Sequence, residues 1–163
     1  MAREIERKFL VRRDRWRPNG ERRTRYRQGY LSTDPERIVR VRADGTMAFL
    51  TIKGLTVGTS RSEYEYRISV DDADEMLDQL CLRPLIEKVR YREAFGEHTW
   101  EIDVFEGANE GLVVAEIELP SANAEFVAPP WLGAEVSDDP RYFNSNLVRA
   151  PFSTWTGHGN DHG

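Results

Sequence analysis

Hydrophobic and polar residues alternate along most of this chain with the two-residue period of a β-strand. Turn residues, such as Asp44-Gly45 and Gly96, interrupt the alternation at short intervals. The pattern predicts eight strands, over residues 5–11, 24–31, 38–42, 47–53, 61–70, 85–93, 98–105 and 113–119. Because short turns join most of them, we expect a mainly β fold, an eight-stranded antiparallel meander that closes into a barrel.

Few helices are expected, and we place them outside the barrel. Three segments have the period or the capping residues of helices: 73–82, 122–127 and 144–148. Asp71 and Asp72 would cap the first of them, and Ser121 the second. The stretch 154–163 is rich in glycine and histidine and predicts a disordered tail, so that residues 1–153 form a single domain.

Composition narrows the class of protein. A hydrophobic content of 39% with 31% charged residues is typical of a soluble globular domain. No apolar run reaches the length of a membrane span, and the acidic opening around Glu4 and Glu6 is unlike a signal peptide. The one cysteine, Cys81, leaves no internal disulfide and indicates a reducing cytoplasm. A net charge of −5 argues against a nucleic-acid partner.

Charged residues lie at alternate positions of the predicted strands, so that those on one strand share a face. The acidic residues are Glu4 and Glu6, Glu63 and Glu65, Glu101 and Asp103, and Glu116 and Glu118. The basic residues are Lys8, Arg40 and Arg42, Lys53, Arg61, and Lys88, Arg90 and Arg92. Paired carboxylates and paired cations are thus largely segregated onto different strands.

Two interpretations of these faces are open. In an ordinary barrel the aliphatic face points inward and the charged face points to water. In a charged tunnel the charged faces enclose the interior, and the aliphatic faces pack outward beneath helices. The segregation of the two signs and their near balance favour the tunnel, because buried charges must compensate one another. Such a tunnel would be costly to fold without ligand, which implies a bound metal and a polyanion.

The residue types indicate phosphate chemistry. Two carboxylates on one strand face, such as Glu4 and Glu6, can share a hard cation such as Mg²⁺ or Mn²⁺. Arginine and lysine on other strands can bind a chain of phosphates. Phosphoryl transfer needs mainly positioning and neutralisation of charge, so no Ser, His or Cys nucleophile is required. We interpret His98 as a surface strand residue.

From Glu4 to about Val148 the chain resembles the CYTH domain, the superfamily of triphosphate tunnel metalloenzymes. The resemblance lies in the order and spacing of Glu4-Ile5-Glu6-Arg7-Lys8, Arg40-Val41-Arg42, Thr51-Ile52-Lys53-Gly54, Arg61-Ser62-Glu63-Tyr64-Glu65, Glu87-Lys88-Val89-Arg90, Asp103 and Glu116-Ile117-Glu118. The compact form looks most like small bacterial inorganic triphosphatases, on the basis of Phe9-Leu10-Val11, Arg27-Gln28-Gly29-Tyr30-Leu31 and Arg141-Tyr142-Phe143-Asn144.

The resemblance implies an eight-stranded antiparallel tunnel in which Mg²⁺ or Mn²⁺ assists attack on a linear triphosphate. The metal ligands it implies are Glu4, Glu6, Glu116 and Glu118, with Asp103 helping them or positioning water. The phosphate-binding residues it implies are Lys8, Arg40, Arg42, Lys53, Arg61 and Arg90, and it implies that Glu63 and Glu65 support the metal or the basic side chains.

Lys88 and Tyr30 match a pair that helps to activate water in some relatives, with Glu116 as a further catalytic residue. A tyrosine base would need a strongly lowered pKa. Tyr30 is interpreted equally well as an aromatic of the barrel wall.

The first functional hypothesis is hydrolysis of inorganic tripolyphosphate to pyrophosphate and phosphate. Thiamine triphosphatase and class IV adenylyl cyclase are alternatives on the same scaffold. A non-catalytic polyphosphate- or nucleotide-binding module and a plain structural barrel are alternatives of other classes. The expected partner is a small molecule that contains a triphosphate, and apolar outer faces of the barrel would fit a homodimer.

Overall fold

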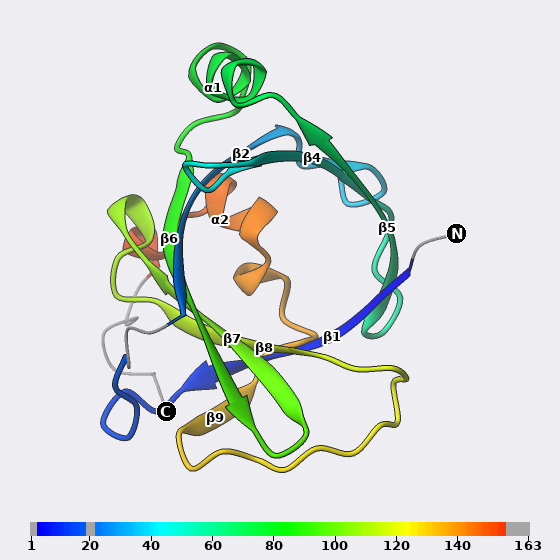
Figure 1. Ribbon diagram of the computed structural model, residues 1–163, viewed down its shortest axis with the longest axis vertical. Helices are drawn as coiled ribbons and strands as arrows, with labels where there is room; N and C mark the ends of the chain where they lie inside the picture. Colours follow the sequence, from blue (N-terminus) through cyan, green and yellow to red (C-terminus); the bar gives the residue numbers. More distant parts are fainter. Residues whose placement is uncertain (1–2, 19–21, 156–163) are drawn as a thin grey trace.

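A barrel of eight antiparallel strands dominates the fold (Figure 1). The computed structural model describes residues 3–18 and 22–155. The barrel strands are β1 (Arg3–Val11), β2 (Arg23–Ser32), β3 (Ile38–Ala43), β4 (Ala48–Lys53), β5 (Ser60–Ile68), β6 (Ile86–Phe95), β7 (His98–Phe105) and β8 (Val113–Glu118). They follow one another around the barrel as β5, β4, β3, β2, β6, β7, β8 and β1, and β1 pairs again with β5. The predicted closed barrel is confirmed, with strand ends that differ from the predicted ones by at most two residues.

β1 closes the barrel because it pairs with β5 along one edge and with β8 along the other. Residues 3–5 pair with β5, whereas residues 6–10 pair with β8 on the other edge. A ninth strand, β9 (Leu132–Glu135), pairs with the end of β1 and is absent from the predicted set, because four residues are too few to show an alternation. Gly133 permits this pairing, since a Cβ there would lie 2.9 Å from the Leu10 carbonyl oxygen.

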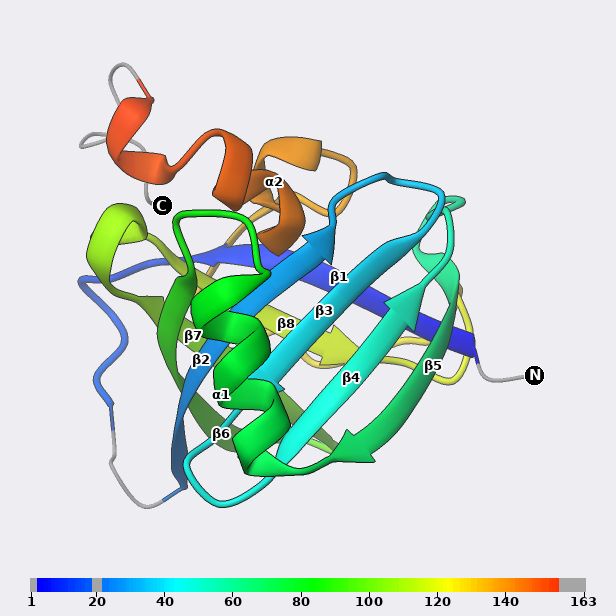
Figure 2. The ribbon, with the colours of Figure 1, turned by 90° about the horizontal axis from the view of Figure 1, so that it is seen from above.

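The apolar faces of the strands point outward and are covered by other parts of the chain. Helix α1 (Val70–Gln79) lies across β3 and β4 (Figure 2), where Leu77 is buried against Val41. On the far side of the barrel, Trp100 and Trp131 pack edge to face with 5.5 Å between their ring centroids. Burial of an aliphatic side chain such as Leu77 stabilises the fold by about 1.5–3 kcal/mol. The charged faces are therefore the inner ones, as in the tunnel interpretation.

Two of the three predicted helices form. Helix α1 begins and ends three residues earlier than predicted, because its N-cap is Ser69, whose hydroxyl accepts a hydrogen bond from the Asp72 backbone N–H. Helix α2 (Asn144–Arg149) confirms the third prediction. The helix predicted over 122–127 is wrong: the segment makes a turn and continues as irregular chain, held by the packing of Phe126 against Trp100.

Helix α2 lies across the interior when the molecule is viewed down the barrel (Figure 1). Its Leu147 and Val148 join a buried cluster with Ile86 and Phe105 at the end of the strands. The Lys8 Nζ donates a hydrogen bond of 3.0 Å to the carbonyl oxygen of Tyr142, just before α2. One end of the barrel is therefore closed by the C-terminal part of the chain.

Three short 3₁₀ turns complete the structure: η1 (Gly107–Asn109), η2 (Pro140–Tyr142) and η3 (Phe152–Thr154). Trp155, within the predicted tail, packs against Phe152, whereas residues 156–163 lie outside the described residues. Within residues 3–18 and 22–155, no helix has the length and apolar character needed to cross a membrane.

Candidate active site

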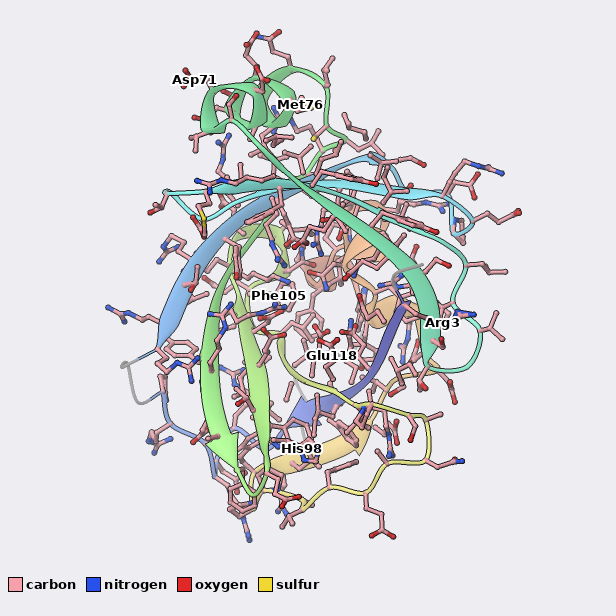
Figure 3. All side chains as sticks on the ribbon, turned by 45° about the vertical axis from the view of Figure 1, so that its right-hand side comes forward. Arg3, Asp71, Met76, His98, Phe105 and Glu118 are labelled. Atoms are coloured by element: carbon pink, nitrogen blue, oxygen red, sulfur yellow. The ribbon has the colours of Figure 1, made fainter. Side chains whose placement is uncertain are left out.

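The barrel encloses a polar cavity of about 210 Å³. Its acidic lining residues are Glu4, Glu6, Glu63, Glu65, Glu101, Glu116 and Glu118. Its basic lining residues are Lys8, Arg40, Arg42, Lys53, Arg61, Lys88 and Arg90. The remaining lining residues are Tyr30, Ile38, Phe143, Asn144 and Ser145. The two signs are equal in number, and Figure 3 shows Glu118 among the side chains that fill the interior.

All but one of the site residues predicted from the sequence line this cavity, and Asp103 is the exception. The prediction missed Glu101, although it shares a strand face with Asp103, and Asn144, although it ends a motif of the family resemblance. A further signal was present in the sequence. The chain has three lysines, at positions 8, 53 and 88, and all three line the cavity.

β1 and β8 together form an acidic wall. Their register places Glu6 opposite Glu118 and Lys8 opposite Glu116. Burial raises the pKa of Glu6 well above its usual value, and the negative charges of Glu116 and Glu4 raise it further. The pKa of Glu116 is lowered in spite of its burial, because the positive charges of Lys8 and Arg90 stabilise the carboxylate. The wall thus holds more negative charge than its own cations compensate.

The acidic wall fits a divalent cation. Glu4 Oε1 is buried without a hydrogen-bond partner, and oxygen atoms of this kind are the ligands that Mg²⁺ and Mn²⁺ prefer. A cation would also relieve the repulsion that raises the pKa of Glu6. In the described part of the chain, no three Asp, Glu, His or Cys side chains are already gathered into a complete site. We therefore expect phosphate oxygens or water to complete the coordination.

Three of the basic side chains are held by carboxylates. Lys53 Nζ lies 3.1 Å from Glu4 Oε2 and 3.2 Å from Glu63 Oε2. Arg40 Nη2 lies 3.5 Å from Glu65 Oε2. Arg90 makes a bidentate pair with Asp103, with distances of 2.7 and 2.9 Å. Planar pairs of this type fix the orientation of the guanidinium as well as compensating its charge.

Three cations of the cavity have no carboxylate partner within residues 3–18 and 22–155: Lys8, whose Nζ binds the Tyr142 carbonyl oxygen, and Arg42 and Arg61, which form neither a hydrogen bond nor an ion pair there. The Nε of Arg42 is buried and unpaired, and the guanidinium lies 4.4 Å from the ring centroid of Tyr26. Burial and the nearby charge of Arg40 lower the pKa of Arg42 to about 10. A guanidinium with a buried, unpaired nitrogen is unfavourable unless an anion meets it.

Lys88 is fully buried and faces two acceptors. Its Nζ lies 2.8 Å from Asp103 Oδ2 and 2.9 Å from Asn144 Oδ1. Burial lowers the pKa of Lys88 to about 7, an effect that Asp103 only partly offsets. An amine with this pKa can take up a proton near neutral pH.

The structure changes the expected roles of two residues. Both oxygens of the Asp103 carboxylate bind Lys88 and Arg90, and the side chain is 0% exposed, so we assign it to those cations in place of a metal or a water. Burial raises the pKa of Tyr30, and its hydroxyl accepts a hydrogen bond from Gln28 Nε2 at 3.1 Å. A raised pKa argues against Tyr30 as a base.

The stability of the protein in metal-free buffer is expected to depend on Glu63. Burial and the adjacent Glu4 raise its pKa from 4.5 to about 7, so the folded state holds a proton that the unfolded state loses first. This stabilisation is complete below pH 4.5 and is lost as the pH rises through about 7. In EDTA, the melting temperature of the wild type should fall between pH 5 and 7, and that of Glu63→Gln should fall less.

Glu135→Gln is the matched control, because Glu135 pairs with Arg7 outside the cavity at 2.6 Å. It should keep the wild-type dependence of melting temperature on pH. Identical pH dependence in Glu63→Gln and the wild type would show that Glu63 holds no such proton.

Comparisons with known proteins agree with this geometry. The family model described as the CYTH domain matches residues 2–146. The inorganic triphosphatase of Acetivibrio thermocellus is 50% identical over 155 residues, which cover 95% of this chain and 99% of that protein. The inorganic triphosphatase of Nitrosomonas europaea is 42% identical over 150 residues, which cover 89% and 96%. The crystal structure of the inorganic triphosphatase NE1496 matches with a TM-score of 0.64 and 38% identity, covering 89% of this chain and 97% of that one. The chain belongs to the CYTH domain family.

Proposed function

We propose that this protein is a triphosphatase that hydrolyses inorganic tripolyphosphate to pyrophosphate and phosphate with Mg²⁺ or Mn²⁺. The observation that carries this proposal is the cavity, where an acidic wall suited to a cation meets half-buried arginines that lack an anion, Arg42 and Arg61. Two relatives that the chain matches along nearly its whole length are named inorganic triphosphatases, which supports the same substrate class.

In this proposal the metal and the triphosphate bind to different sets of side chains in the cavity. A divalent cation, when bound, neutralises negative charge on the phosphates. The residues that would hold it are Glu4, Glu6, Glu116 and Glu118. The residues that would bind phosphate oxygens are Lys8, Arg40, Arg42, Lys53, Arg61 and Arg90. Glu63, Glu65 and Asp103 keep three of these cations in place through the ion pairs described above.

Lys88 serves as the base in this reaction. Its Nζ takes a proton from the attacking water, the water oxygen bonds to the terminal phosphorus, and the bridging P–O bond breaks to release pyrophosphate. Tyr30 keeps its proton, because burial raises its pKa. Its role is to donate a hydrogen bond within the cavity that it lines.

Release of phosphate from tripolyphosphate, ATP and thiamine triphosphate, each with Mg²⁺, Mn²⁺ or EDTA, tests the function. We expect fast release from tripolyphosphate with metal and none in EDTA. The other two substrates should react more slowly, because α2 closes one end of the barrel and limits the room for an organic group. Preference for thiamine triphosphate, or conversion of ATP to cyclic AMP, would identify the alternative enzymes. Tight binding of tripolyphosphate without turnover would identify a binding module.

Two further predictions concern the cellular compartment and the oligomeric state of the protein. The buried, unpaired Cys81 supports a reducing cytoplasm. Ile52, Tyr64 and Tyr66 are exposed on the outer face of β4 and β5, which supports a homodimer. Light scattering of the purified protein would report the oligomeric state.

A further inference from the structure

A row of four polar side chains runs along the closed end of the cavity. Lys88 Nζ on β6 donates to Asn144 Oδ1 on α2 at 2.9 Å. Gln28 Nε2 on β2 donates to the same oxygen at 3.2 Å and to the Tyr30 hydroxyl oxygen at 3.1 Å. Lys88, Gln28 and Tyr30 are at most 3% exposed, so the row is shielded from bulk water. One oxygen of α2 therefore connects two strands of the barrel.

The direction of each hydrogen bond in the row follows from the chemistry of its members. The ammonium group of Lys88 only donates, so Asn144 must present its carbonyl oxygen to it. That oxygen only accepts, so Gln28 must turn its NH₂ group toward Asn144. The same NH₂ group donates to the Tyr30 oxygen. The phenolic hydrogen of Tyr30 is then left for an acceptor in the cavity that this side chain lines.

The row also fixes the orientation of the Lys88 nitrogen. Besides Cε, a tetrahedral nitrogen has three positions. Asp103 Oδ2 at 2.8 Å and Asn144 Oδ1 at 2.9 Å take two of them. In the neutral amine, its two hydrogens meet these two oxygens, so the lone pair is left for the third position. Because Lys88 lines the cavity, we infer that this position faces it.

We propose that Asn144 and Gln28 are positioning residues that aim the Lys88 lone pair and the Tyr30 O–H at the same reacting phosphate. Helix α2 is then part of the reaction machinery as well as the end wall of the barrel. The proton of the attacking water goes to Lys88, and Tyr30 donates a hydrogen bond without losing its proton. This inference rests on the proposed function and extends it to Gln28 of β2 and to Asn144 of α2, outside the barrel strands.

Substitutions in α2 test the inference. Asn144→Ala removes the shared acceptor, and kcat for tripolyphosphate should fall about 10- to 100-fold with KM within about twofold, because substrate binding is kept and orientation is lost. Asn144→Asp keeps an oxygen acceptor but places a negative charge beside Lys88 and raises its pKa, so it should restore kcat only at a higher pH than the wild type needs. Asn146→Ala is the matched control: Asn146 lies two residues further along the helix and donates to the Pro140 carbonyl at 2.8 Å, and its loss should leave kcat unchanged.

The three lysines provide a second readout that does not depend on turnover. A protein labelled with ¹⁵N at the lysine side chains gives three signals, from Lys8, Lys53 and Lys88. In Asn144→Ala the Lys88 signal should move, whereas that of Lys53, held by Glu4 and Glu63, should stay.

The inference requires both a lower kcat and a shifted Lys88 signal in Asn144→Ala. A lower kcat with an unchanged Lys88 signal overturns it, and so does a shifted signal with an unchanged kcat. A rise in KM that accounts for the whole loss of kcat/KM also overturns it. A wild-type protein that does not hydrolyse tripolyphosphate would instead refute the proposed function, so the two failures are distinguishable.

Discussion

Glu6→Gln should lose tripolyphosphate turnover by about a thousandfold or more, because catalysis by a metal ion contributes several kcal/mol and each 1.36 kcal/mol is tenfold in rate. Glu6 lies on the acidic wall beside Glu4 and Glu116, and the substitution replaces a proposed carboxylate ligand of the metal with a neutral amide. Steady-state phosphate release with Mg²⁺ or Mn²⁺ measures the effect.

The same substitution should raise thermal stability in EDTA. The pKa of Glu6 is raised in the folded state, so the wild type loses stability as the pH rises above 4.5, the ordinary value for this group. Glutamine carries no charge and avoids this loss, so the advantage of the variant should grow with pH. Glu135→Gln, outside the cavity, should change neither turnover nor this pH dependence. Full activity in Glu6→Gln would contradict the claim that the acidic wall holds a catalytic metal.

Lys88→Met should lower kcat about 10²- to 10⁴-fold, the usual contribution of a general base. In the wild type, kcat should fall on the acidic side with an apparent pKa near 7, because the Lys88 amine must be neutral to accept a proton. In the variant this acidic limb should disappear. The measurement is the pH profile of phosphate release from tripolyphosphate between pH 5 and 9, at saturating metal.

A charge-conserving substitution separates proton transfer from simple attraction. Lys88→Arg keeps the positive charge but cannot give up a proton, so it should be as inactive as Lys88→Met. Lys53→Arg makes the same chemical change at a lysine between two carboxylates, and it should cost much less. Equal activity of Lys88→Arg and the wild type would mean that Lys88 acts only through its charge.

The barrel and most of its lining were predictable because both depend on a local rule. Side chains of a strand alternate between two faces, so Glu4, Glu6 and Lys8 had to share one face wherever β1 lay in the fold. The balance of acidic and basic residues then indicated which face is inside, since an outer charged face has no need of compensation.

Other features depend on contacts between distant parts of the chain, which alternation does not encode. β9 exists because Gly133 can approach β1 closely, and the segment 122–127 is held by the packing of Phe126 on Trp100. Asp103 lies on the predicted face, yet its two oxygens are bound by cations of the neighbouring strand. Asn144 reaches the cavity only because α2 folds across the end of the barrel.

The central claim is that the charged cavity cleaves a linear triphosphate with the help of a divalent metal. ³¹P NMR of tripolyphosphate mixed with the wild-type protein tests it directly, because substrate and both products give separate signals. With Mg²⁺ or Mn²⁺ we expect the tripolyphosphate signals to be replaced by pyrophosphate and phosphate in equal amounts, and EDTA should stop the change. Tripolyphosphate signals that persist in the presence of metal would contradict the claim.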